Sequence, residues 1–135
     1  MKTGIEWQVS SLELSQKLKE LGCPQESLFY WTKEVEDQDY YVWWETRDCH
    51  SYTERMANCI SAYTVAELGE LLTGDRDWFS GKSWNEKVFG CNAHRGRDYI
   101  ERVEADTEAD ARAAMAIYLI EQGLLDVKTL HHEQN

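Results

Sequence analysis

Several features that would place this chain in a specialised class are scarce or missing. The sequence holds one proline and no C-x-x-C pair. It has no apolar run near the roughly 18 residues that a membrane-spanning helix needs, and no apolar signal core near its start. We therefore expect a cytoplasmic protein with one domain over residues 1–135 and a short polar tail from about residue 128.

Basic side chains are also few. Lysine and arginine number 14 against 25 aspartates and glutamates, which gives a formal net charge of −11. A protein that grips nucleic acid through its phosphates needs the opposite balance, so we expect no direct nucleic-acid binding. The bias is uneven, because residues 1–70 hold 13 acidic and 6 basic side chains, whereas residues 82–102 hold 3 and 5.

The common catalytic motifs are missing as well. The sequence contains no G-x-S-x-G, no H-E-x-x-H and no G-x-G-x-x-G. Gly81-Lys82-Ser83 resembles the end of a phosphate-binding loop, but Arg76 stands where that loop needs its first glycine. We therefore predict no catalytic residues and no cofactor.

The four cysteines are widely spaced, and we expect free thiols. One alternative stays open, because thiolate and imidazole are zinc ligands. It is a zinc-stabilised domain or a small metal-dependent enzyme built on Cys49, His50, Cys59, Cys91 and His94. Structural zinc sites usually take their ligands in close pairs, which this chain lacks, so we assign no metal ligand.

Three helices are predicted from their amino-terminal capping patterns. Ser10 with Glu13, Thr64 with Glu67, and Thr107 with Asp110 have the spacing of a capping box. Leucines or alanines follow each box at helical spacing, and a glycine follows each predicted helix. The predicted helices cover residues 11–21, residues from Thr64 to just before Gly74, and residues of about 107–122.

The segments between these helices predict strands. Residues 27–33 and 40–45 are rich in aromatic and β-branched residues and are separated by a polar stretch, which favours an antiparallel hairpin. Residues 83–91 and 97–105 predict a second hairpin around a loop at 92–96, with 97–105 at a sheet edge. Residues 46–62 are interpreted as irregular, with a short helix or strand near 59–63. The resulting α-β-β-α-β-β-α order predicts an α+β domain, a mostly antiparallel sheet with three helices packed on it.

The first hairpin is the candidate partner-binding surface. The chain has six tryptophans, seven tyrosines and three phenylalanines, and several of them occupy this hairpin. Because alternate strand residues face opposite sides, either Trp43 or Trp44 must point outward. Helices covering both faces would bury these rings, whereas an open face would present them to a partner. The candidate residues are Glu34, Glu36, Asp37, Asp39, Tyr41, Trp43, Trp44 and Glu45.

Four segments together carry a resemblance to a known group of proteins. They start with Ser11-Leu12-Glu13-Leu14, Gln25-Glu26-Ser27-Leu28, Tyr63-Thr64-Val65-Ala66 and Thr107-Glu108-Ala109-Asp110. In this order they cover about half the chain and resemble small uncharacterised proteins encoded by phages and prophages. The resemblance implies a phage accessory protein in the cytoplasm of a bacterial host cell. It implies no activity and no catalytic residue.

Together these observations predict a non-enzymatic protein that acts by protein–protein interaction. One form of this hypothesis is inhibition of a host nucleic-acid-binding or defence protein, whose basic groove an acidic, aromatic surface would occupy. A structural subunit that oligomerises through its aromatic hairpins belongs to the same class. The metal-dependent enzyme or zinc-stabilised domain remains the alternative.

Overall fold

The computed structural model describes residues 4–33, 39–44, 59–73, 76–82 and 88–132, and they form an α+β fold, as predicted. In chain order the elements are the 3₁₀ helix η1 (Gly4–Trp7), α1 (Leu12–Glu20), β1 (Phe29–Thr32), β2 (Tyr41–Trp44), β3 (Ile60–Ala62), α4 (Val65–Leu72), β4 (Asp77–Lys82), β5 (Phe89–Arg95), β6 (Asp98–Ala105), α5 (Glu108–Glu121) and α6 (Val127–His132). No helix within these ranges has the length and apolar character to cross a membrane.

The strands form two antiparallel sheets of three strands each, in the orders β2-β1-β3 and β4-β5-β6. The predicted hairpin of residues 27–33 and 40–45 is confirmed as β1 and β2, with Tyr30 opposite Trp43. Two strands complete the sheets. β3 lies within the segment 59–63, one of the two options left open, and β4 was not predicted.

The second predicted hairpin is present with different bounds. Residues 83–87 lie outside the described ranges, and β5 runs from Phe89 through Arg95, across most of the predicted loop. The turn is tighter than expected because Gly96 adopts a positive φ of 61°. β6 lies at the edge of its sheet, as its imperfect alternation predicted.

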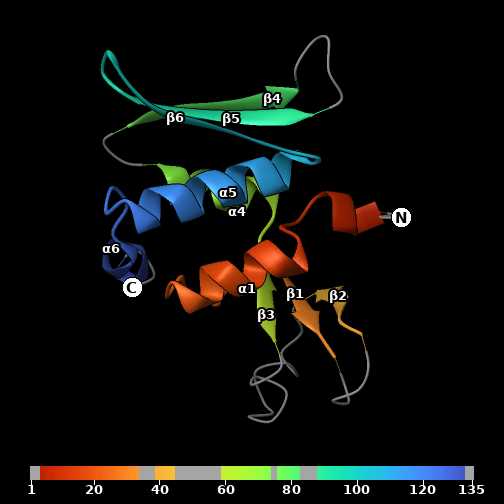
Figure 1. The fold of residues 1–135 in the computed structure, drawn as a ribbon. Helices are drawn as coiled ribbons and strands as arrows, with labels where there is room; N and C mark the ends of the chain where they lie inside the picture. Colours follow the sequence, from red (N-terminus) through yellow and green to blue (C-terminus); the bar gives the residue numbers. More distant parts are fainter. Residues whose placement is uncertain (1–3, 34–38, 45–58, 74–75, 83–87, 133–135) are drawn as a thin grey trace.

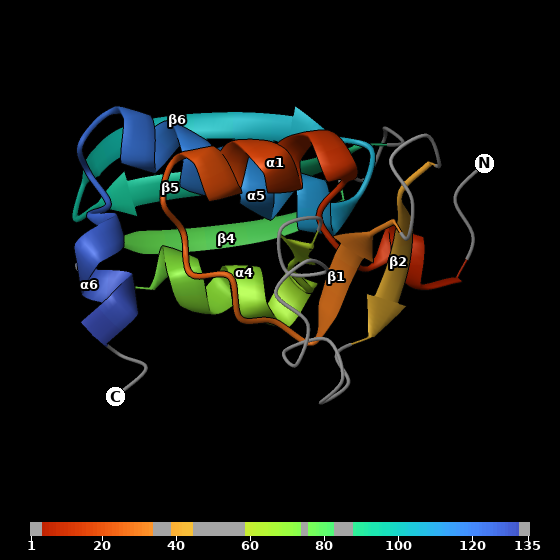
Figure 2. The ribbon, with the colours of Figure 1, turned by 90° about the horizontal axis from the view of Figure 1, so that it is seen from below.

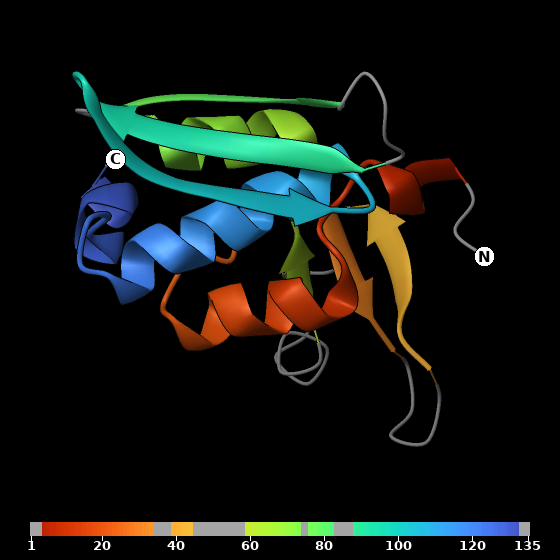
Figure 3. The same ribbon diagram turned by 45° about the horizontal axis from the view of Figure 1, so that its top comes forward.

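Helix α5 is the centre of the molecule. It packs on the sheet β4-β5-β6 together with α4, and α1 lies on its other side (Figure 1). Views from two further directions show the same layering, with the sheet β2-β1-β3 beside α1 (Figures 2 and 3). Ala109, Ala113 and Ala116 are fully buried on α5. Such small side chains let a helix approach neighbours on several sides, which explains the alanine-rich sequence.

The helix starts test the capping predictions. The Thr64–Glu67 capping box of α4 is confirmed, and Thr107 caps α5 by accepting the amide of Asp110. For α1 the predicted cap is wrong by one residue, because Ser11 accepts the amide of Leu14. The Ser10 hydroxyl instead lies 2.7 Å from that of Ser15 and accepts the amide of Tyr63 at 3.1 Å.

The predicted polar tail from about residue 128 is corrected for residues 128–132. Val127–His132 form α6, and Leu130 is only 6% exposed. Leu130 joins the large core below the sheet β4-β5-β6, and Val127 packs against that core from three residues earlier. This spacing places both apolar side chains on one helix face, among polar neighbours that conceal the pattern.

Candidate functional site

The described part of the predicted partner surface is exposed on β2 and just before it. Asp39 is exposed, and 36% of Tyr41 and 49% of Trp43 remain accessible. The two rings meet edge to face with centroids 6.1 Å apart. Glu34, Glu36, Asp37 and Glu45 lie outside the described residues, and Trp44 is placed by its backbone pairing with Phe29. The rings of Tyr41 and Trp43 therefore form one open aromatic surface, which we call the hairpin face.

The sheet register explains why this face is open. Tyr30 lies opposite Trp43 and shares its side of the sheet, whereas Trp31 points to the other side. Trp31 is 8% exposed, packs with Val9 and Ile60, and donates its indole N–H to the Ser10 carbonyl at 2.8 Å. The core that contains Trp31, Val9 and Ile60 thus covers one side of this sheet. On the other side Tyr30 is buried and Trp43 is not.

A second aromatic group lies on the outer face of the sheet β4-β5-β6. Phe79 and Tyr99 are each 59% exposed, and the ring of His94 lies between them. The His94 ring stacks on Phe79 at 6.3 Å and meets Tyr99 at 5.6 Å. No described helix or strand covers this side of the sheet (Figure 1). Sequence reasoning missed the group because β4, which presents Phe79, was not predicted.

Mixed charge surrounds this second group. Arg102 lies over Gly90, where any Cβ would overlap its guanidinium, and its Nη2 is 3.3 Å from a Glu104 carboxylate oxygen. Glu104, which follows the mildly basic segment 82–102, therefore offsets the charge of Arg102.

The cysteine and histidine set is not assembled in the described residues. Cys91 is fully buried in the large core, whereas His94 stacks on the opposite face of the same strand. Cys59 lies next to β3, with its sulfur 3.5 Å from the Thr32 hydroxyl. Cys49 and His50 are outside the described ranges. Nowhere in those ranges do three or more His, Cys, Asp or Glu side chains gather as metal ligands would.

Two of the thiols have an environment that suppresses reactivity. Burial raises the pKa of Cys23 to about 11. Burial also raises the pKa of Cys91 to about 11, although the nearby Arg112 guanidinium opposes the shift. Both sulfurs are therefore protonated at neutral pH, and a protonated thiol is a poor nucleophile and metal ligand.

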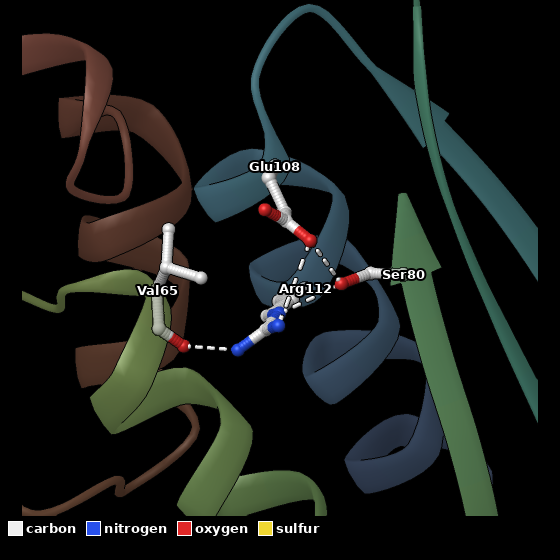
Figure 4. A network of polar contacts seen from close by, with 4 residues as sticks. All are labelled: Val65, Ser80, Glu108 and Arg112. Carbon is white, nitrogen blue, oxygen red and sulfur yellow. Dashed lines mark hydrogen bonds and ion pairs between the residues drawn. The ribbon is translucent and has the colours of Figure 1, made fainter. Parts of the chain in front are cut away.

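A partly buried polar network lies between α4, β4 and α5 (Figure 4). Ser80 and Glu108 share a hydrogen bond of 2.6 Å, and the Arg112 Nε donates to the Ser80 hydroxyl at 2.8 Å. Arg112 also donates to the Val65 carbonyl and lies over the Trp78 ring at 4.7 Å. The Arg112 side chain thus links the start of α4 and the strand β4 to α5. We therefore interpret the network as one that stabilises the packing of these three elements.

An open pocket of about 200 Å³ lies between the α1–β1 connection, α4 and α6. Its lining consists of Pro24, Glu26, Tyr63, Glu67, Glu70, Leu71 and Leu130. The buried Pro24, Tyr63 and Leu130 and the half-buried Leu71 form a floor that mixes apolar and polar surface, and exposed Glu26 and Glu70 provide an acidic rim. Burial raises the pKa of Tyr63 well above its usual range, so this hydroxyl stays neutral and donates to the Pro24 carbonyl.

Comparison of the chain with models of protein families, with curated proteins and with solved structures finds no significant match. The surfaces and the pocket described above are therefore the features of the molecule that bear on its function.

Proposed function

We propose that this protein acts without catalysis, by binding another protein through the hairpin face and the acidic residues that flank β2 in the sequence. The observation that carries the proposal is the exposure of Trp43 and Tyr41 as adjacent rings. Aromatic side chains supply much of the contact energy in interfaces because they bury a large area and lose little side-chain entropy. Because strand β2 holds both rings in place, this contact surface is already formed before a partner binds.

The charge of the chain indicates the chemistry of the partner. With a net charge of −11 and Asp39 exposed just before β2, the surface favours a basic protein and repels nucleic acid. A basic groove that normally holds nucleic acid has both the charge and the apolar base-stacking surfaces that an acidic, aromatic ligand needs. We therefore propose a nucleic-acid-binding or defence protein of a bacterial host as the partner, in the phage setting that the sequence resemblance implies.

Strand β2 also stands at one end of its sheet, in the order β2-β1-β3, where β1 is the described strand that pairs with it. An exposed edge can accept a strand from another chain and add main-chain hydrogen bonds to the aromatic contact. The proposed contact therefore includes the hairpin face and this edge.

The test compares capture of host proteins by matched variants. The wild-type protein, Trp43→Ala and Phe79→Ala are immobilised and exposed to the same bacterial lysate, with and without added duplex DNA. Phe79 is the control because it is an exposed ring on the other sheet. We expect a basic protein that the wild type and Phe79→Ala retain, that Trp43→Ala loses by about tenfold or more, and that DNA displaces.

Two results would contradict the proposal. Equal retention by Trp43→Ala and the wild type would show that the hairpin face is not the contact. Retention that DNA leaves unchanged would show that the partner's nucleic-acid site is not the target. Circular dichroism of each variant before capture checks that the fold is intact.

A further inference from the structure

The pocket between the α1–β1 connection, α4 and α6 presents both apolar and acidic surface to a ligand. Pro24, Leu71 and Leu130 contribute apolar surface to its floor, and its rim holds the carboxylates of Glu26 and Glu70. No basic side chain is among its described lining residues. A ligand that gains from both surfaces needs a hydrocarbon part and a positive charge.

Glu67, the third carboxylate in the pocket lining, also stabilises the fold through hydrogen bonds. Glu67 accepts the amide of Thr64 at 2.9 Å in the capping box and the amide of Leu28 at 3.1 Å. These hydrogen bonds hold its negative charge in place beside the floor. Glu67 therefore adds a carboxylate at a fixed position in the pocket lining.

The size of the pocket limits the ligand further. Sites for cofactors and drug-sized ligands usually measure about 300–1,000 Å³. At about 200 Å³ the pocket is smaller and has room for one extended side chain. Arginine and lysine fit these demands, since each has an aliphatic stem that packs on apolar surface and a charged head that stays near water.

We propose that this pocket binds one arginine or lysine side chain of a partner protein. The stem lies on Leu71 and Leu130, and the cationic head lies near Glu26 and Glu70. Leu28 supports a protein partner rather than a free amine, because it is 61% exposed and its amide is bonded to the lining residue Glu67. The partner residues on either side of the inserted side chain then pack against Leu28.

This inference does not rest on the proposed function of the hairpin face, because the two sites share no residue. The test uses small probes and needs no identified partner. N-acetyl-arginine N-methylamide and the lysine equivalent are titrated into the protein, and the methyl groups of Leu71 and Leu130 are followed by NMR. The citrulline equivalent is the control, since it matches arginine in shape and lacks the charge.

We expect the arginine or lysine probe to shift both leucine methyl groups, and the citrulline probe to bind at least about tenfold more weakly. Glu26→Gln and Glu70→Gln should each weaken binding of the charged probe about two- to fivefold, as expected for exposed charge pairs. Glu13→Gln, at an exposed position on α1 outside the pocket, should leave binding unchanged.

Equal binding of the citrulline probe would overturn the proposal, as would methyl shifts that Glu26→Gln and Glu70→Gln leave unchanged. An absence of shifts with both charged probes would also overturn it. None of these results bears on capture through the hairpin face. A failure there, with normal probe binding here, would likewise leave the pocket assignment intact.

Discussion

The two tryptophans on neighbouring strands of the sheet β2-β1-β3 illustrate how differently this fold uses one residue type. Trp31 on β1 is 8% exposed and its indole N–H is hydrogen-bonded, whereas Trp43 on β2 is 49% exposed. The register places them on opposite sides of the sheet. The inner ring holds the sheet against α1 and the residues before it, and the outer ring is available for contact.

The sheet β4-β5-β6 shows the same division between its two faces. On its inner side Arg112 bridges Ser80, Glu108 and the α4 backbone over the Trp78 ring. On its outer side Arg102 pairs with Glu104, and both side chains are over a third exposed. Each contrast thus sets a buried or partly buried side chain on the inner side against an exposed side chain on the outer side.

The largest predicted effect separates the two tryptophans. Trp31→Ala should lower the free energy of unfolding by about 3–5 kcal/mol, because it opens a cavity and removes a buried hydrogen bond. Trp43→Ala should lower it less, by about 1 kcal/mol, because half of this side chain is already exposed and its described ring contact is the edge-to-face pair with Tyr41. Urea unfolding followed by circular dichroism measures both. Equal losses would contradict the assignment of faces.

The two arginine–glutamate pairs give the next contrast. Arg112→Met should cost about 2 kcal/mol, because it leaves Ser80, Glu108 and the Val65 carbonyl without a partly buried donor. Arg102→Met, on the outer face, should cost at most about 1 kcal/mol. Urea unfolding measures both variants. A larger loss of unfolding free energy for Arg102→Met than for Arg112→Met would contradict the assignment of inner and outer faces.

The capping box of α4 should have a smaller, well-defined contribution. Thr64→Ala removes the hydroxyl that accepts the Glu67 amide at 3.1 Å and should destabilise the protein by about 1 kcal/mol. Thr64→Ser, which keeps the hydroxyl, is the control and should retain most of the stability. A loss as large for serine as for alanine would assign the effect to packing of the methyl group.

The smallest effect concerns two buried thiols, Cys23 and Cys91. With the pKa of Cys23 and Cys91 raised to about 11, roughly one thiol in a thousand is ionised at pH 8. Iodoacetamide labelling of the folded protein, located by peptide mass spectrometry, should therefore leave both unmodified and should accelerate as the pH rises toward 11. Rapid labelling at pH 8 in the folded state would contradict this environment.

Local sequence signals predicted the parts of the fold that local interactions decide. The Thr64–Glu67 box and the pairing of residues 27–33 with 40–45 follow from contacts within a few residues or from aromatic patterning. The start of α1 was misplaced because Ser10 bonds Ser15 and Tyr63, and the partner at residue 63 is invisible to a local pattern. β4 was missed because its strand identity comes from pairing with β5.

For the candidate site, too, local sequence patterns predicted only part of what the structure shows. Alternation along β2 required one tryptophan to face outward, but only the sheet register identifies Trp43 as exposed. The pocket was beyond sequence reasoning, because its lining comes from residues 24–26, 63–71 and 130. Nothing in the local composition of α6 indicates that Leu130 reaches this floor.

Hydrogen–deuterium exchange of the protein, alone and bound to the partner that the capture experiment recovers, shows which strands lie in the interface. If the hairpin face is the contact, binding slows exchange in β2, residues 41–44, and leaves the edge strands β4 and β6 unchanged. Slower exchange across residues 77–82 and 98–105, with residues 41–44 unaffected, would contradict a contact through the hairpin face and would assign it to the face of Phe79, His94 and Tyr99.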